Sequence, residues 1–436
     1  MVPPFGVARQ RDMSDASARS GLPERRSLFV TQDFPPDRGG IARLYGELCM
    51  RLPHVEVSTV AGGDACLDGL PVHRMSFPLG HAHRPANILR WARWARDHVR
   101  RRGISLLHVG NIRPAGYVAA LLRRDMGIPY IVYTHGKDLL KERRKGTHRW
   151  IVRAGTREIL GNAAAIVANS AATARLACDI LSGLGRTDTC PRVHVVHPGA
   201  DPTRFRPNVE GASAWRREVA GDGPLLLSVA RLVRRKGIDT VIEALPAILT
   251  GHPTTTYAVV GTGPDLERLR TLARTLGVSD HVQFVGDVED VDLPACYAAA
   301  DLFLLPTREI PAADEVEGFG IAYVEAAAAC VPSIAAHTGG VADAVSHGVS
   351  GVLVAPDSPD AVAAAAVRLL SNPVLRARLG RNGRAMVQQV LNWDRAAAEI
   401  THIENVVTGA VRHSTHVPTG DSVLAIGRER PSTGRA

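Results

Sequence analysis

The segment SLFVTQDFPPDRGGIARL, residues 27–44, runs from a short apolar stretch through a Gly-Gly loop into an apolar-periodic stretch. This order predicts a strand over 27–32 followed by a helix over 41–52. The same order returns at PLLLSVARLVRRKGIDTVIEAL, residues 224–245. Each half of the chain therefore begins with the strand–loop–helix unit of an α/β fold.

Strand and helix patterns alternate along most of the chain. Short runs rich in β-branched residues indicate buried strands, and apolar residues spaced three to four apart predict helices between them. Such alternation gives parallel sheets covered by helices on both faces. The predicted strands are 27–32, 55–60, 105–110, 129–134, 164–169, 193–198, 224–230, 256–261, 282–286, 302–306, 332–336 and 351–355. The predicted helices are 41–52, 86–102, 114–126, 147–161, 171–183, 237–250, 264–276, 292–299, 318–330, 340–346, 359–371 and 394–409.

The pattern restarts near residue 223, which divides the chain into two doubly wound parallel-sheet domains. We expect them at 25–203 and 223–392, with a linker over the polar residues 204–222. A chain of 436 residues with 45% hydrophobic side chains is large enough for two cores. The polar, aperiodic ends predict a disordered leader over 1–24 and a disordered tail over 411–436.

Cysteine usage and hydropathy indicate a cytoplasmic protein. The six cysteines form no C-x-x-C pair, so we expect reduced structural thiols and neither a zinc site nor a redox motif. The first residues contain no apolar run of signal-peptide length. No stretch approaches the ~18 apolar residues of a membrane-spanning helix, so membrane contact would be peripheral.

The basic balance favours an anionic partner. Lys and Arg exceed Asp and Glu by 52 to 43, giving a net charge of +9. This excess fits an anionic ligand, an anionic membrane or a basic solvated surface. Residues 84–103 form an amphipathic pattern with Trp91, Trp94 and many arginines. That helix is suited either to lie on an anionic membrane or to pack on the sheet with its arginines in solvent.

Open parallel sheets bind ligands beyond the carboxyl ends of their strands, so motifs directly after strands are the candidate site. The first is DFPPDRGG, 33–40, where Gly39 and Gly40 precede a helix. Glycines permit close backbone approach, and a helix N-terminus offers free N–H groups to phosphate. A tight turn between strand and helix explains the same residues without a ligand.

A second motif, RLVRRKG, follows the first strand of the second domain. Arg231 and Lys236 lie five residues apart in a loop that enters a helix. Two cations at this place can hold a diphosphate, Arg as a fork and Lys as a point charge. Arg234 and Arg235 are interpreted as solvated neighbours. A basic surface loop is the alternative.

The third motif, EGFGIAYVE, contains two carboxylates eight residues apart. Helical periodicity over 318–330 places Glu317 and Glu325 about two turns apart on a similar face. Glu317 can accept hydrogen bonds from sugar hydroxyls, and Glu325 from a diol such as ribose. A solvated helix face is the alternative for the pair. The backbone amides that could meet phosphate are those of Gly318, Phe319, Gly320 and Ile321.

The fourth motif, YTHGKD, places His135 directly after a predicted buried strand. An imidazole there can hydrogen-bond a sugar hydroxyl or support charge separation. A structural histidine is the alternative.

In their order and spacing, these motifs resemble family 4 of the glycosyltransferases, which has the GT-B fold of two Rossmann-like domains facing across a cleft. The resemblance covers about residues 27–410. It implies that Gly39 and Gly40 approach the donor, and that Arg231 and Lys236 bind its diphosphate and stabilise the leaving group. It further implies contacts of Glu317 with the sugar.

The resemblance also assigns the remaining positions. Glu325 would contact the ribose and His135 would lie near the sugar, while a helix over 393–410 would cross back onto the first domain. Family members retain the anomeric configuration, and no metal ion or cofactor is required. The sequence contains no D-x-D in a suitable loop, in agreement with this. Two positions depart from the family pattern: Cys330 replaces a usual glycine and Asp343 a usual glutamate.

Within the family, VTQDFPPDRGGIARL and EVEGFGIAYVEA are most similar to bacterial phosphatidylinositol-mannoside-type mannosyltransferases. This implies GDP-mannose as donor and a lipid-linked or glycan acceptor. Alternatives are a UDP-sugar transferase of polysaccharide synthesis, a sugar-nucleotide epimerase and a non-catalytic partner subunit of the same fold. A nucleic-acid partner is not expected, because the basic residues are dispersed except near 90–102 and 141–149.

Overall fold

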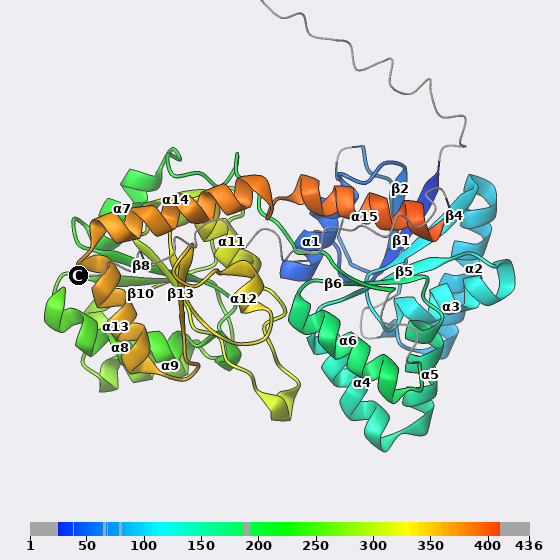
Figure 1. The fold of residues 1–436 in the computed structure, drawn as a ribbon, viewed down its shortest axis with the longest axis horizontal. Helices are drawn as coiled ribbons and strands as arrows, with labels where there is room; N and C mark the ends of the chain where they lie inside the picture. Colours follow the sequence, from blue (N-terminus) through cyan, green and yellow to red (C-terminus); the bar gives the residue numbers. More distant parts are fainter. Residues whose placement is uncertain are drawn as a thin grey trace, which may run out of the picture.

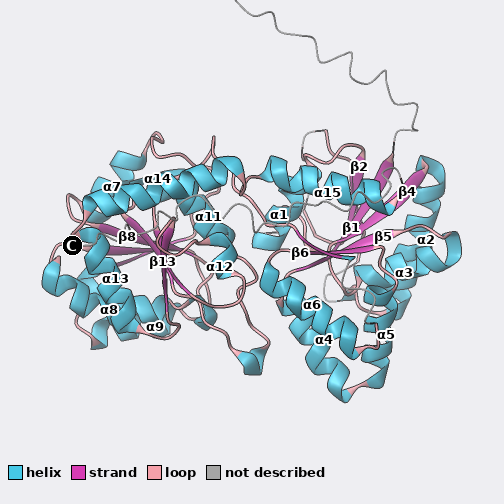
Figure 2. Cartoon of the chain, in the orientation of Figure 1, coloured by secondary structure: helices cyan, strands magenta, loops and turns pink. Residues whose placement is uncertain are grey.

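The computed structural model describes residues 25–37, 39–63, 67, 69–77, 81–186 and 192–409. Within these residues the chain forms two α/β domains lying side by side (Figure 1). In each domain, helices enclose a parallel sheet (Figure 2). The predicted leader 1–24, the tail 411–436, Cys66 and Cys190 fall outside the described residues.

The first domain contains a seven-stranded sheet of order β3-β2-β1-β4-β5-β6-β7. Every ladder is parallel. The order reverses between β1 and β4, which is the topological switch point of a doubly wound sheet. The strands are β1 (Arg26–Thr31), β2 (Val55–Thr59), β3 (Val72–Arg74), β4 (Ile104–Val109), β5 (Tyr130–Thr134), β6 (Ala165–Ala168) and β7 (Val193–Val195).

The second domain repeats this plan with six strands in the order β10-β9-β8-β11-β12-β13. Its ladders are also parallel, and its switch point lies between β8 and β11. The strands are β8 (Leu225–Val229), β9 (Thr256–Val260), β10 (Val282–Gly286), β11 (Leu302–Leu305), β12 (Ser333–Ala336) and β13 (Gly351–Val354).

The helices bury their apolar faces against these sheets. Those of the first domain are α1 (Gly40–Cys49), α2 (Pro85–Arg102), α3 (Ala115–Met126), α4 (Lys137–His148), α5 (Trp150–Gly161) and α6 (Ala171–Gly183). Those of the second are α7 (Ala212–Ala220), α8 (Ile238–Gly251), α9 (Leu266–Thr275), α10 (Leu293–Ala299), α11 (Ile321–Ala328), α12 (Val341–Ala344), α13 (Pro359–Leu370) and α14 (Pro373–Gln389).

Each predicted strand has a counterpart in the structure, whereas β3, α4, α7 and α14 were not predicted. Strand β3 has only three residues. Helix α7 lies inside the predicted linker 204–222, and Phe205 and Ala212 belong to the core of the second domain. Helix α14 contains Gly380 and Gly383, which obscure a helical pattern. Both glycines let α14 lie close to the end of α11, since a Cβ on Gly383 would come within 3.2 Å of Ala327.

The last described helix, α15 (Trp393–Val407), joins the core of the first domain. Trp393 and Ile400 are buried there with Phe29 and Tyr133. Polar contacts add to this packing, for example the 2.9 Å contact between His108 Nε2 and a carboxylate oxygen of Glu404. Figure 1 shows α14 and α15 as one band that spans both domains. The crossing implied by the family resemblance is therefore present.

Helix α2 packs on the first sheet with its apolar face. Trp91 is fully buried, and its indole N–H donates to Ser58 Oγ over 2.8 Å. Trp94 is half-buried and stacks on His98 with 4.8 Å between the ring centroids. The structure thus shows the packed alternative for this helix, whose solvent side carries arginines together with Asp97 and the 46% exposed Leu89.

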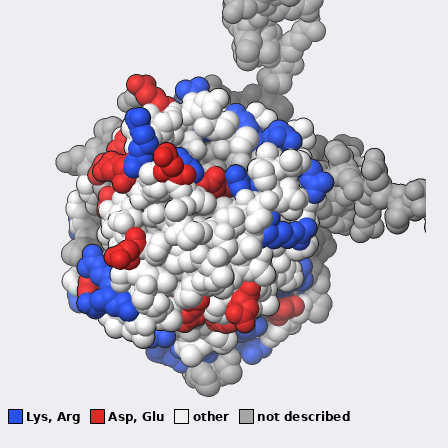
Figure 3. Space-filling model, turned by 90° about the vertical axis from the view of Figure 1, so that its left-hand side faces the viewer, with Lys and Arg blue, Asp and Glu red and all other residues white. Residues whose placement is uncertain are grey.

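Charges of both signs surround an uncharged area at the outer end of the second domain (Figure 3). This face therefore lacks the single-sign basic surface typical of nucleic-acid binding.

Cys330 occupies a position that favours glycine. It follows α11 as the left-handed residue of a Schellman motif, with φ of 62°, while Val331 N–H donates to the Ala326 carbonyl over 2.9 Å. A side chain in this conformation costs about 1 kcal/mol relative to glycine. We expect Cys330→Gly to raise the free energy of unfolding by about that amount in urea titration. Unchanged or lower stability would show that packing of the thiol outweighs the backbone effect.

Candidate active site at the domain interface

The strongest candidate residues lie on the two loops that flank the switch point of the second sheet. Lys236 ends the 3₁₀ turn Arg234–Lys236, which follows β8. Glu317 lies near the end of the long loop between β11 and α11. Because ligands of doubly wound sheets bind at the switch point, this is the position expected for a nucleotide site.

These loops meet through a compact ion cluster. Lys236 Nζ lies 2.5 Å and Arg235 Nη1 2.7 Å from the same oxygen, Glu317 Oε2. Burial alone would raise the pKa of Glu317, but the two cations outweigh it and the pKa is lowered. The interpretation of Arg235 as solvated was therefore wrong. Arg231 is exposed, and its side chain pairs with none of the described residues.

A glycine fixes the distance between the two loops. Gly237 has φ of 69°, and a Cβ there would strike the backbone of Pro306, directly after β11. Only glycine combines this left-handed conformation with so close an approach. The loop carrying Lys236 is thus held against the start of the loop carrying Glu317.

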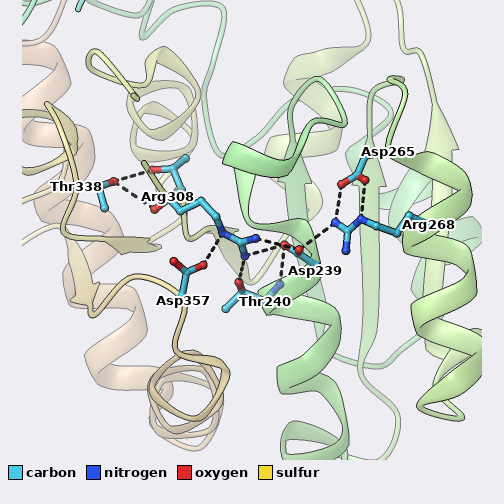
Figure 4. A network of polar contacts seen from close by, with 8 residues as sticks. Asp239, Thr240, Asp265, Arg268, Arg308, Thr338 and Asp357 are labelled. Atoms are coloured by element: carbon cyan, nitrogen blue, oxygen red, sulfur yellow. Dashed lines mark hydrogen bonds and ion pairs between the residues drawn. The ribbon is translucent and has the colours of Figure 1, made fainter. Parts of the chain in front are cut away.

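A partly buried polar network connects the same two loops (Figure 4). Arg308, just after β11, binds both oxygens of Asp239, at the start of α8, with bonds of 2.8 and 3.0 Å. Its backbone N–H also donates to the Arg235 carbonyl over 2.9 Å. Arg268 adds a 2.9 Å bond to Asp239. Burial would raise the pKa of Asp239, but Arg308 and Arg268 lower it. Arg308 is therefore a positioning residue for Lys236 and Glu317.

Replacing Arg308 by alanine leaves the buried Asp239 with Arg268 as its remaining guanidinium partner. We expect Arg308→Ala to lower the free energy of unfolding by about 2–4 kcal/mol and to raise KM for the donor. Arg270→Ala is the matched control, because Arg270 pairs with Glu267 on an exposed helix face and such pairs contribute about 1 kcal/mol or less. Equal stability of the two variants in chemical denaturation would contradict this role.

The two carboxylates of the E-x7-E motif do not share a helix face. Helix α11 begins at Ile321, because Gly320 adopts φ of 93° and Gly318 precedes it, so Glu317 lies in the loop. Glu325 is only 4% exposed. One of its oxygens lies 2.6 Å from Arg43 of α1, and the other accepts from Tyr297 over 2.8 Å. Glu325 thus joins the two domains, and a ribose would have to displace Arg43 to reach it.

His135 directly follows β5, and its backbone carbonyl lies beside Gly318 of the second domain. Its Nε2 is 2.6 Å from the Tyr45 hydroxyl, which itself donates to the Gly110 carbonyl. This arrangement assigns the proton to Nε2 and leaves Nδ1 as an acceptor. Burial lowers the pKa of His135 to about 4, so the ring is neutral near pH 7. A neutral imidazole fits a hydrogen-bonding role at the site.

The remaining predicted residues lie at the same interface. Gly40 begins α1, and a Cβ on it would be 3.9 Å from the side chain of Ile321 across the interface. Gly39 precedes it and has open space around it. Phe319 is buried and stacks on His197 of the first domain with 5.6 Å between the ring centroids. The structure therefore brings the glycine loop of the first domain to the N-terminus of α11.

Several interdomain contacts were not predicted. Asp343 accepts from the Ala171 amide over 2.6 Å and pairs with His197 over 3.0 Å. Lys137 pairs with Glu315 over 2.7 Å. The departure of Asp343 from the family pattern was the one sequence signal that marked any of these positions. Such contacts between distant segments have no periodicity that a sequence could display.

One group of side chains in the described part of the chain has the composition of a metal site. Ligand atoms of Glu56, His73 and His98 lie within 4.8 Å of one another. They come from β2, β3 and α2, away from the interdomain residues. Burial would raise the pKa of Glu56, but hydrogen bonds from Arg102, His73 and His98 lower it to about 2. These bonds satisfy the carboxylate within the protein, and none of the three residues reaches the interdomain site.

The assembled site has the charges that transfer from a phosphorylated donor requires. Exposed Arg231 and clustered Lys236 and Arg235 can neutralise a diphosphate at the switch point. Glu317 offers hydrogen-bond acceptors, and His135 of the first domain offers a neutral imidazole.

Residues 40–191 match the family described as "Glycosyl transferase 4-like domain", and residues 212–386 match "Glycosyl transferases group 1". The chain belongs to the glycosyltransferases of GT-B fold.

Characterised relatives cover nearly the whole chain. It is 33% identical over 395 residues to the GDP-mannose-dependent alpha-(1-6)-phosphatidylinositol monomannoside mannosyltransferase of Mycobacterium tuberculosis, covering 86% of this chain and 97% of the relative. It is 28% identical to the enzyme of Corynebacterium glutamicum that acts on monoacylated phosphatidylinositol monomannoside, covering 87% and 97%. The Anabaena protein HepE, solved with UDP and glucose, shares the fold with a TM-score of 0.71 at 20% identity, covering 88% and 100%.

No helix among the described residues has the length and apolar character needed to cross a membrane. The four described cysteines are free thiols, in agreement with the sequence analysis.

Proposed function

We propose that this glycosyltransferase transfers mannose from GDP-mannose to a phosphatidylinositol-mannoside-like lipid, with retention of anomeric configuration and without a metal ion. The observation that carries the proposal is the cluster of Lys236, Arg235 and Glu317 at the switch point, next to which the His135 carbonyl of the first domain lies beside Gly318. The donor and acceptor follow from the relatives that are 33% and 28% identical over most of their length.

The cluster suits departure of a nucleoside diphosphate. As the bond between the sugar C1 and the diphosphate oxygen breaks, negative charge develops on the phosphate, where Lys236 and Arg231 can stabilise it. In the retaining step, the acceptor hydroxyl attacks C1 from the same face. Its proton passes to the departing phosphate oxygen as the new glycosidic bond forms. Glu317, released from Lys236, accepts hydrogen bonds from the sugar hydroxyls.

We propose that this step needs no metal ion, because Lys236, Arg235 and Arg231 supply positive charge where the diphosphate is proposed to bind. We expect mannosyl transfer to continue at an unchanged rate in the presence of a chelator. Loss of activity on chelation, restored by Mg²⁺ or Mn²⁺, would contradict this part of the proposal.

A UDP-sugar donor is the second candidate, since the fold is shared with a protein solved with UDP and glucose. A thermal shift series with GDP, UDP, ADP and their sugar conjugates separates the two. A ligand that binds the native state raises the melting temperature by mass action. A shift with GDP and GDP-mannose alone supports the mannosyltransferase, and a shift with UDP compounds alone replaces GDP-mannose as donor. No shift with any of them would favour a non-catalytic partner subunit.

The lipid acceptor requires a peripheral contact with the cytoplasmic face of the membrane. Helix α2, the segment whose sequence suggested such a contact, offers the exposed arginines Arg90, Arg93, Arg100 and Arg101 but keeps Trp91 buried. Its contribution is therefore electrostatic attraction to anionic lipids. The helix exposes a single large apolar side chain, Leu89 at 46%, so we expect another surface to supply most of the insertion into the lipid.

A further inference from the structure

The corner between α4 and α5 exposes two large apolar side chains. Trp150 is 80% and Ile151 60% exposed, and Trp150 is the most exposed large apolar side chain among the described residues. The chain breaks at Arg149, whose φ of −139° and ψ of 101° end α4 and start α5. The two side chains thus begin a helix at an outward corner. Single exposed apolar residues are ordinary, but no other two in the described chain are adjacent in sequence.

Exposed cations surround this corner, which we call the α4–α5 corner. They come from the last turns of α4 and the first turns of α5, on both sides of Trp150. The only acidic residue between positions 139 and 157 is Glu142, which is buried and paired with Arg113 over 2.8 Å. The apolar pair therefore lies inside a basic surface. Its exposed cations are Lys141, Arg143, Lys145, Arg149, Arg153 and Arg157; Arg144 is also exposed, but it pairs with Asp314 of the second domain over 2.6 Å.

The corner is connected directly to the candidate active site. Helix α4 starts at Lys137, two residues after His135, and contacts the second domain there through Glu315. Its 12 residues span about 18 Å at 1.5 Å per residue. Figure 1 shows the corner at the lower end of the first domain. A lipid held in a membrane at the corner thus has its headgroup about one short helix away from the site.

We propose that the α4–α5 corner docks on an anionic lipid bilayer, with Trp150 and Ile151 inserted among the headgroups. This inference rests on the proposed lipid acceptor and names the surface that brings the enzyme to it. An indole suits the interface because it combines an apolar body with one N–H donor. The surrounding Lys and Arg side chains are attracted to anionic headgroups.

Charge and area favour a bilayer over a protein partner. A specific protein interface buries about 800 Å² on each side, whereas two side chains at an outward corner offer only a fraction of that area. Interfacial membrane binding needs only a few inserted apolar groups together with electrostatic attraction. The corner has this composition.

The first test is co-sedimentation of the full chain with vesicles of equal parts phosphatidylglycerol and phosphatidylcholine. We expect binding that weakens as salt is raised, and little binding to pure phosphatidylcholine. The double variant Trp150→Ser/Ile151→Ser should partition about tenfold to a hundredfold more weakly. Val374→Ser, which removes an apolar side chain that is 77% exposed on α14 of the second domain, is the matched control and should bind like the parent.

Tryptophan emission gives a second readout that does not depend on activity. Vesicles should shift the emission of the parent to shorter wavelength, and Trp150→Phe should lose most of this shift. Equal vesicle binding by the parent and the double variant, or an unchanged shift in Trp150→Phe, would overturn the proposal. The assay contains no donor or acceptor, so its outcome is separate from that of the nucleotide thermal shifts. If GDP-mannose stabilises a protein that does not bind vesicles, the proposed transferase stands and the α4–α5 corner is not its membrane surface.

Discussion

Replacing Lys236 by alanine is expected to lower kcat/KM for the nucleotide sugar by about a thousandfold. Lys236 Nζ lies 2.5 Å from Glu317 in a largely buried position at the switch point, where charge on a departing phosphate is least screened by water. The fold should persist, because Arg235 keeps Glu317 paired after the substitution. Steady-state kinetics and a thermal melt of the same preparation check both statements.

The matched control for this variant lies in the same 3₁₀ turn. Arg234 is exposed, and its backbone carbonyl accepts from Gly237 N–H in the turn. Arg234→Ala removes one positive charge from the loop without touching the cluster. We expect less than a severalfold change in kcat/KM. An equal loss of kcat/KM in the two variants would show that the net charge of the loop matters and the position of Lys236 does not, and full activity of Lys236→Ala would contradict its role.

A side chain at Gly318 is expected to reduce kcat by about a hundredfold through loss of the interdomain arrangement. A Cβ there would meet the His135 carbonyl of the first domain and lie 2.7 Å from Asn169 Nδ2. Neither the carbonyl nor the buried Asn169 can give way cheaply, so Gly318→Val should hold the two domains apart. A misplacement of this size separates His135 from Glu317 and removes productive alignment.

Small-angle scattering and kinetics together test the Gly318 prediction. The variant should show a larger radius of gyration than the parent and a similar thermal melt. The control is Gly183→Ala, since Gly183 ends α6 and has open space where a Cβ would lie. A fully active Gly318→Val protein would show that the observed approach of the domains is not needed for transfer.

The sequence was most informative about functional residues that lie in the loop directly after a strand. Buried parallel strands are continuous apolar runs, and the ends of those runs located the loops with Lys236, Glu317 and His135. Doubly wound topology then requires that residues after β8 and β11 meet. The pairing of Lys236 with Glu317 agrees with that expectation.

The sequence could not predict side-chain contacts between residues that are far apart along the chain. Arg235 has the same local pattern as the exposed Arg234, and only the 3₁₀ turn directs it to Glu317. The partnership of Arg43 with Glu325 joins helices from different domains, which no spacing rule relates. The start of α11 was predicted too early, at residue 318, because the apolar periodicity already begins there. The left-handed conformation of Gly320 prevents the helix from starting before Ile321.

Helix α4 was missed for a different reason. Its sequence, KDLLKERRKGTH, is mostly charged and presents few apolar positions. A helix of this kind gives a weak hydrophobic signal because only one narrow side is buried. The same composition places the basic residues of the α4–α5 corner on the surface.

The connection between the domains restricts how they can move. The chain crosses twice at one place: Ala200 N–H donates to the Leu391 carbonyl over 2.9 Å, and Ala200 also pairs with Asn392. A Cβ on Gly199 would lie 2.6 Å from Trp393 N, so the two crossings are in close contact. Two connections fixed to each other permit the domains to rotate about a shared axis and oppose sliding of one domain past the other.

Figure 1 places this axis, at the junction of α14 and α15, on the side opposite the α4–α5 corner. Opening therefore separates Lys137 from Glu315 by much more than it moves residues beside the axis. Opening in this way would widen the interface on the side that carries the α4–α5 corner, so with the corner docked as proposed, donor and lipid would enter from the membrane side.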